Sequence, residues 1–140
     1  MHKKVANTFL LCYNYYGDNM EKDIFCKIID GEIPSYKLYE DEVCLAFLDI
    51  NPESNGHTLV IPKKHFLDIY DMDDETLKHI FSVARTLSKK ITNKLNASGV
   101  IFTQNNGDPQ VVKHYHLHII PFYVNNELID VKEIFNKLND

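Results

Sequence analysis

The sequence contains no tryptophan and is poor in glycine and proline, with five of each among its 140 residues. Collagen-like chains and low-complexity disordered chains are rich in glycine and proline, so both classes are excluded. The 44% content of hydrophobic residues instead indicates one folded domain with its own core, which we expect to span residues 20–140. Residues 1–19 are expected to be a disordered extension. A targeting peptide is the alternative, because His2-Lys3-Lys4 precedes a short apolar run.

Cysteine is also scarce. The three residues Cys12, Cys26 and Cys44 are too few for a disulfide-rich secreted fold, and their odd number favours a reducing, cytoplasmic setting. No apolar run approaches the roughly 18 residues that a membrane-spanning helix needs, so we expect no membrane partner. Fifteen Lys and Arg against 20 Asp and Glu give a net charge of −5, which argues against a broad basic surface for nucleic acid. The expected partners are therefore small molecules or proteins.

Short strand patterns surround one long helical pattern. Apolar residues recur at steps of three and four from residue 73 to residue 95, which predicts one long helix. A motif that resembles a capping box, Asp130 with Glu133, predicts a short helix that closes the chain. Because the connections between strands are short, neighbouring strands should be antiparallel, which predicts an α+β fold: about five antiparallel strands, one long helix and short terminal helices. The expected strands are residues 36–38, 43–48, 57–61, 100–103 and 111–123.

Three histidines, His114, His116 and His118, alternate with bulky side chains. On a strand, residues i, i+2 and i+4 share one face, so the three imidazoles should line one side. A packed core gains nothing from such a row, because each ring costs desolvation free energy unless it is hydrogen-bonded. We interpret the row as nucleophilic catalysis on phosphorus, in which the central ring attacks and the outer rings orient. A zinc site or a merely polar strand face is the alternative.

The segment 110–121 resembles the signature of the histidine triad superfamily, His-x-His-x-His followed by two apolar residues. Other segments are similar, in the same order, to blocks of the histidine triad nucleotide-binding proteins, and the resemblance spans about residues 23–123. It implies a hydrolase or transferase that acts on the α-phosphate of nucleotide conjugates, commonly purine nucleoside phosphoramidates, through a nucleotidyl-histidine intermediate. The matching blocks are residues 23–29, 32–34, 47–50 and 56–65.

The resemblance also implies roles for individual residues. His116 would be the nucleophile and His118 a hydrogen-bond donor to the phosphate, while His114 and His57 would support the geometry of the rings. The chemical step would need no metal. Val111 stands where many relatives carry Ser or Thr, which alters the side of the site that faces the leaving group.

The nucleotide itself would be held by further residues that match the family's positions. Asp49 would accept hydrogen bonds from the ribose hydroxyls, which suits a carboxylate beside a vicinal diol, and Asn105 and Gln110 would face the phosphate. An apolar pocket would enclose the base and the sugar. Its residues would be Phe25, Ile28, Phe47, Leu48 and Ile50.

A structural zinc ion is a further possibility that the resemblance raises. Some relatives bind zinc through Cys-x-x-Cys, His57 and the first triad histidine, but Asp23 occupies the earlier cysteine position of this chain. The candidate ligands are therefore Asp23, Cys26, His57 and His114, and a buried free Cys26 is the alternative.

The expected assembly is a homodimer. The strand 100–103 is short, apolar and uncharged, and an open sheet edge of this kind must be covered or paired. The resemblance implies the same, because relatives form two-fold dimers in which the two sheets join. Two other functions stay open: a dinucleoside polyphosphate hydrolase, and a nucleotide-binding or protein-interaction module whose hydrolysis is incidental.

Overall fold

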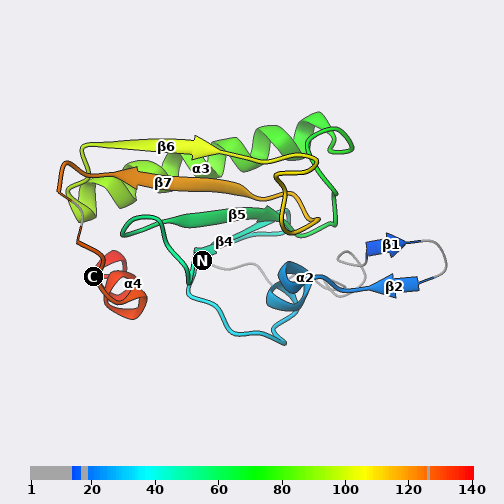
Figure 1. Ribbon diagram of the computed structural model, residues 1–140, viewed down its shortest axis with the longest axis horizontal. Helices are drawn as coiled ribbons and strands as arrows, with labels where there is room; N and C mark the ends of the chain where they lie inside the picture. Colours follow the sequence, from blue (N-terminus) through cyan, green and yellow to red (C-terminus); the bar gives the residue numbers. More distant parts are fainter. Residues whose placement is uncertain (1–13, 17–18, 126) are drawn as a thin grey trace.

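The computed structural model describes residues 14–16, 19–125 and 127–140. Its centre is a five-stranded antiparallel sheet in the order β3-β4-β5-β7-β6, with α3 (Asp74–Leu95) along one face (Figure 1). Two shorter helices, α2 (Ile24–Ile29) and α4 (Val131–Leu138), complete the predicted α+β architecture, which is confirmed. The strands are β3 (Lys37–Glu40), β4 (Cys44–Leu48), β5 (Thr58–Pro62), β6 (Gly99–Thr103) and β7 (Leu117–Phe122).

The long helix α3 begins and ends where the sequence predicted. Asp73 caps its first turn by accepting a hydrogen bond from the amide of Thr76 at 3.0 Å. At the other end Asn96 adopts a left-handed conformation, with φ of 56°, which stops the helix. The buried face of α3 packs on the sheet through residues such as Ile80, Ala84 and Ile91.

Strand β4 is buried on both faces because two separate apolar clusters cover the sheet. Cys44, Ala46 and Leu48 belong to the cluster on the α3 side. Leu45 and Phe47 belong to a second cluster on the opposite side, which contains the buried residues of α2. This arrangement explains why the sequence of β4 is a continuous apolar run without polar alternation.

The strand that carries the histidines is shorter than predicted. The sequence indicated a strand over residues 111–123, but β7 begins only at Leu117. Pro62 explains the difference: it has no amide hydrogen to donate to a ladder that would continue past the Val60–Leu117 pair. The amide of Tyr115 instead donates to the carbonyl of Phe66 at 2.8 Å. The alternation persists nonetheless, because Tyr115 and Leu117 point into the core on the α3 side.

The beginning of the chain differs from the expected extension. Residues 14–16 (β1, Asn14–Tyr16) pair with residues 19–21 (β2, Asn19–Glu21) in a separate antiparallel ribbon that the sequence did not predict. The other residues of the expected extension, 1–13 and 17–18, lie outside the described residues, and their disorder stays a prediction. Within the described part of the chain, no helix combines the length and the apolar character that crossing a membrane requires.

Candidate active site

A cleft of about 490 Å³ opens on the face of the sheet that carries α2. The cleft brings together eight residues that the sequence analysis assigned to the site, from α2, from the end of β4 and from the start of β7. Its lining is otherwise largely apolar. The eight predicted residues are Phe25, Ile28, Phe47, Leu48, Asp49, Ile50, His116 and His118.

The central histidine, His116, is held in one orientation and one tautomer. Its Nδ1 lies 2.8 Å from the carbonyl oxygen of His114, so Nδ1 carries the proton and donates it. The Phe25 ring packs edge-on against the imidazole, with 4.9 Å between the centroids. Burial lowers the pKa of His116, and the neighbouring imidazoles lower it further. The ring is therefore neutral near pH 7, and its Nε2 retains a free electron pair.

His118 is held in the complementary state by a chain of hydrogen bonds. The amide of Glu53 donates to Nδ1 of His57 at 3.0 Å, so the proton of His57 must be on Nε2. That nitrogen lies 2.9 Å from Nδ1 of His118 and donates to it. Burial lowers the pKa of both rings, which keeps them neutral. The one proton of His118 is therefore on Nε2, where it is available as a donor.

Asp49 lies at the mouth of the cleft with acceptor capacity to spare. One carboxylate oxygen accepts a hydrogen bond from the amide of Asn51 at 2.8 Å. The other oxygen lies 3.6 Å from Nε2 of His57, and one fifth of the side chain is exposed. A carboxylate has about four acceptor positions, so Asp49 can accept two further bonds from a ligand.

The two amide side chains that were assigned to the phosphate lie outside the lining of the cleft. Gln110 is buried, and its amide donates to the carbonyl of Leu67. Asn105 lies in the loop between β6 and β7, where its backbone carbonyl accepts a hydrogen bond from the Gln104 side chain. Contact of Asn105 and Gln110 with a phosphate stays a prediction.

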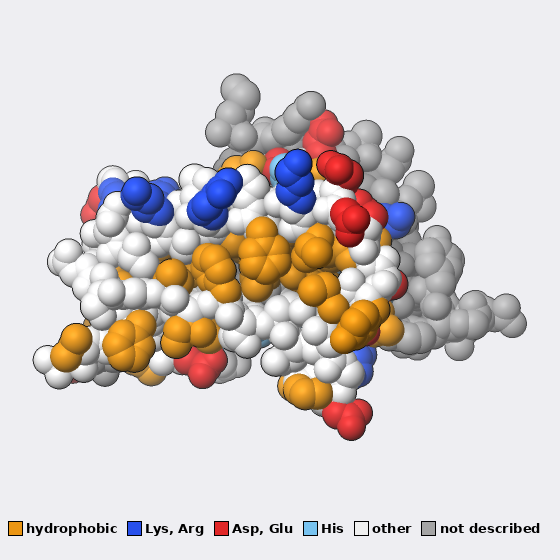
Figure 2. All heavy atoms as spheres, turned by 90° about the horizontal axis from the view of Figure 1, so that it is seen from above, with side chains coloured by type: hydrophobic (Ala, Val, Ile, Leu, Met, Phe, Trp, Pro, Cys, Tyr) orange, Lys and Arg blue, Asp and Glu red, His pale blue; other side chains and the backbone are white. Residues whose placement is uncertain are grey.

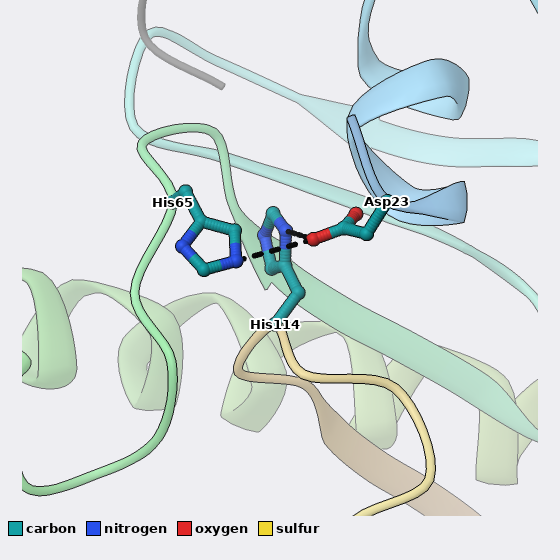
Figure 3. Close-up of side chains that lie close together, drawn as sticks. All are labelled: Asp23, His65 and His114. Carbon is teal, nitrogen blue, oxygen red and sulfur yellow. Dashed lines mark hydrogen bonds and ion pairs between the residues drawn. The ribbon is translucent and has the colours of Figure 1, made fainter. Parts of the chain in front are cut away.

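A second cluster brings the first triad histidine, His114, together with Asp23 and His65 (Figure 3). Oδ2 of Asp23 is 3.1 Å from Nδ1 of His114 and 3.2 Å from Nε2 of His65. The sulfur of Cys26 is 3.7 Å from the same His114 nitrogen. The expected zinc set is therefore wrong in two members. His57 lies with Asp49 and His118, and His65 takes its place. Cys26 is disulfide-bonded, so neither a Cys26 zinc ligand nor the alternative of a free Cys26 thiol is correct.

The second cluster has the donor atoms of a metal site. The side chains of Asp23, His65 and His114 bring their ligand atoms within 4.8 Å of one another. Burial disfavours the Asp23 carboxylate, but hydrogen bonds from His114 and His65 outweigh it and lower the pKa of Asp23. Nε2 of His114 lies 2.9 Å from the carbonyl oxygen of Pro62, so a single proton on this distant nitrogen would leave Nδ1 free to bind a metal. These residues fit a zinc ion.

Comparison with known proteins gives one consistent result. Residues 30–125 match the family model of the HIT domain. The adenosine 5'-monophosphoramidase HNT1 of Saccharomyces cerevisiae is 47% identical over 100 residues, which are 70% of this chain and 61% of the yeast protein.

Solved structures agree with this match. A HIT-like protein from Bartonella henselae is 38% identical and has a TM-score of 0.77, over 89% of this chain and 97% of that one. A zinc-bound histidine triad family protein from Mycobacterium smegmatis is 34% identical and has a TM-score of 0.70, over 83% and 89% of the two chains. The chain therefore belongs to the histidine triad (HIT) superfamily.

Proposed function

We propose that this protein is a nucleotidyl hydrolase that cleaves purine nucleoside phosphoramidates, or related adenylated conjugates, at the α-phosphate. The observation that carries the proposal is the pair of complementary tautomers: a free electron pair on Nε2 of His116 beside a proton on Nε2 of His118. The two ring centroids are 4.9 Å apart, so both nitrogens can reach one phosphoryl group. The name of the yeast relative, an adenosine 5'-monophosphoramidase, supports the same chemistry.

The reaction runs in two displacements at phosphorus. Nε2 of His116 attacks the α-phosphorus while the bond from phosphorus to nitrogen breaks, and the leaving amine takes up a proton from solvent. The Nε2 proton of His118 stabilises the charge that develops on a phosphoryl oxygen. Water then attacks the nucleotidyl-histidine, which releases the nucleotide, restores His116 and returns one proton. The sum is hydrolysis, in which water supplies an oxygen to phosphorus.

The apolar wall of the cleft accounts for the choice of a nucleotide. Phe25 and Phe47 pack edge to face, with 5.9 Å between the ring centroids, and offer an apolar surface for a flat base. Asp49 lies where the ribose of such a nucleotide can donate hydrogen bonds to it. We therefore expect the base to be buried against α2 and the ribose to bind beside Asp49.

Steady-state assays decide between this function and its nearest alternative. We expect an AMP amidate to be hydrolysed with a kcat/KM at least about tenfold above that of a diadenosine polyphosphate, because the yeast relative is an adenosine 5'-monophosphoramidase. The reverse order would assign the protein to the dinucleoside polyphosphate hydrolases. Tight binding of AMP without turnover of either compound would identify a binding module.

The pH dependence follows from the lowered pKa of the nucleophile. Only the neutral ring attacks, and burial moves the pKa of His116 below its ordinary value of 6.5. The acid limb of kcat/KM should therefore have its midpoint below pH 6.5. In the unfolded chain His116 takes up its proton near pH 6.5, whereas in the folded protein it does so only at lower pH. The free energy of unfolding should therefore decrease as the pH falls from 6.5. A midpoint above 6.5 in the rate profile would contradict the buried, neutral nucleophile.

We further propose that the second cluster binds one structural zinc ion through Asp23, His65 and His114. The ion would fix the start of α2 to the loop that follows β5, since the Asp23 carboxylate also caps α2 at 2.8 Å from the amide of Cys26. Binding would replace the present contact between His65 and the carbonyl of Lys113.

Metal analysis tests the zinc proposal. The protein purified without a tag should contain about one zinc ion per chain by elemental mass spectrometry, and His65→Ala should lose it. His57→Ala is the matched control and should retain the metal, because His57 lies in the other cluster. Retention of zinc by His65→Ala, or a metal-free wild type, would refute this assignment.

We also propose that the protein forms a two-fold dimer through β6 and α3. Strand β6 is an edge of the sheet, and Val100, Ile101 and Phe102 are between 38% and 50% exposed. Figure 2 shows the resulting apolar band, bordered by a row of Lys and Arg. The first turn of α3 is acidic and its last turn basic, so antiparallel pairing with a second α3 brings opposite charges together.

The dimer has a direct test in solution. Sedimentation equilibrium at micromolar concentration should give twice the chain mass of 16.3 kDa. Phe102→Asp should shift the mass toward the monomer, because a charge in the apolar band has to be desolvated on pairing. Val124→Asp, at a position that is 83% exposed and outside the band, is the control and should stay dimeric. A wild type that remains a monomer would overturn the proposal.

A further inference from the structure

The donor state of His118 depends on a turn that contains no catalytic group of its own. Residues 53–57 form this turn, which two hydrogen bonds close: the amide of Glu53 to Nδ1 of His57, and the amide of His57 to the carbonyl of Ser54 at 3.1 Å. The first of these bonds sets the tautomer of His57. A displacement of the turn would therefore break the hydrogen bond that fixes the tautomer of His57. The proton of His118 would then no longer be held on Nε2.

The tip of the turn, Asn55, is tied to the C-terminal segment by three hydrogen bonds. Its side-chain nitrogen donates to the carbonyl of Glu127 at 2.8 Å, and its side-chain oxygen accepts from the amide of Ile129 at 3.0 Å. Its backbone carbonyl accepts from the hydroxyl of Tyr123 at 2.6 Å. One residue thus joins the turn to a segment about 70 positions later in the chain.

The residues on either side of Asn55 pack against β7 and α3. Ser54 is buried and donates to the carbonyl of Pro121 at 2.6 Å. Gly56 has a φ of +90°, and a Cβ there would lie 2.8 Å from Leu95 and 2.9 Å from Ile91. The backbone therefore approaches α3 more closely than a side chain would allow. The contacts of Asn55 add a third attachment, to the chain that follows β7.

We propose that Asn55 is a positioning residue for catalysis: through its bonds to Tyr123, Glu127 and Ile129, it holds the Glu53 amide on His57 and so keeps His118 a proton donor. The inference rests on the proposed function only for its kinetic consequence. Its structural consequence, the tautomers of His57 and His118, exists in the ligand-free protein.

The experiment combines imidazole ¹⁵N chemical shifts with steady-state kinetics. In the wild type, Nδ1 of His57 and of His118 should be unprotonated. In Asn55→Ala, which loses both side-chain bonds, we expect mixed tautomers of both rings and a kcat about tenfold lower, with KM for the nucleotide substrate changed less. Asn55→Asp keeps the acceptor for Ile129 and should lie between the two proteins.

A matched control and a milder variant separate positioning from general stability. Asn139→Ala removes a similar side-chain hydrogen bond, from the Asn139 amide group to the carbonyl of Phe135 on α4. This variant should leave the tautomers and kcat unchanged. Tyr123→Phe removes only the hydrogen bond to the Asn55 carbonyl. It replaces Asn55→Ala in the same measurements if Asn55→Ala does not fold. Wild-type ¹⁵N shifts in a folded Asn55→Ala would overturn the proposal, even with a lower kcat. A wild type without hydrolytic activity would refute the proposed function and leave the ¹⁵N result decisive for Asn55.

Discussion

Replacement of His116 by alanine should lower kcat by at least about four orders of magnitude while KM changes little. The physical reason is that, in the proposed mechanism, Nε2 of His116 forms the covalent bond to phosphorus, and no other nitrogen described in the cleft has a free electron pair held in place. The nucleotide loses few ground-state contacts, since the base and ribose would be bound by α2 and the end of β4. Single-turnover and steady-state kinetics on an AMP amidate measure the effect.

The matched control for this prediction is another histidine of the same domain. His79 lies on α3 and contacts Asp41 at 2.6 Å, away from the lining of the cleft, so His79→Ala should retain wild-type kcat. Rapid quenching of the wild-type reaction should also trap a nucleotide on His116. If His116→Ala kept most of its turnover, or if the trapped nucleotide mapped to another residue, the nucleophile would have to be reassigned.

Replacement of Asp49 by alanine should abolish discrimination between ribose and dideoxyribose. We expect the wild type to bind AMP roughly 100-fold more tightly than its 2',3'-dideoxy analogue, because a carboxylate oriented for two hydroxyls is left unpaired when they are absent. Asp49→Ala should bind both ligands equally and weakly. Isothermal titration with the two nucleotides gives both affinities directly.

The control for the second prediction is an exposed carboxylate that lies outside the cleft. Asp74→Ala, in the first turn of α3, removes the same charge from the protein and should preserve the preference for ribose. Equal affinity of the wild type for AMP and the dideoxy analogue would show that Asp49 does not contact the sugar.

Local patterns in the sequence were sufficient to predict most of the fold. The apolar period from residue 73 to residue 95 defines α3, because an acidic cap and a left-handed Asn96 agree with it at the two ends. The continuous apolar run of β4 agrees with its burial on both faces. The length of β7 could not be predicted in the same way. It depends on which strand lies beside it, and the sequence does not reveal that Pro62 occupies the neighbouring position.

The candidate site shows the same limit. The alternation of His114, His116 and His118 predicted a row of imidazoles, and the structure brings two of them to the cleft with Asp49. The zinc set was predicted with the wrong histidine because His57 and His65 belong to one sequence block. Strand β5 lies between them and, at ~3.3 Å per residue over five residues, separates its ends by roughly 16 Å. Only the finished sheet shows which end of β5 each histidine joins.

The position of the histidine row beside β5 gives the two clusters separate anchors. At one end of the histidine row, the carboxylate of Asp23 contacts His114 and His65. At the other end, His57 donates to His118 and accepts from the amide of Glu53. His116 lies between them, and its Nδ1 donates to the backbone carbonyl of His114. The two anchors share no residue, but both outer imidazoles lower the pKa of His116. A change at one anchor should therefore not combine additively with a change at the other, because both act on the same central ring.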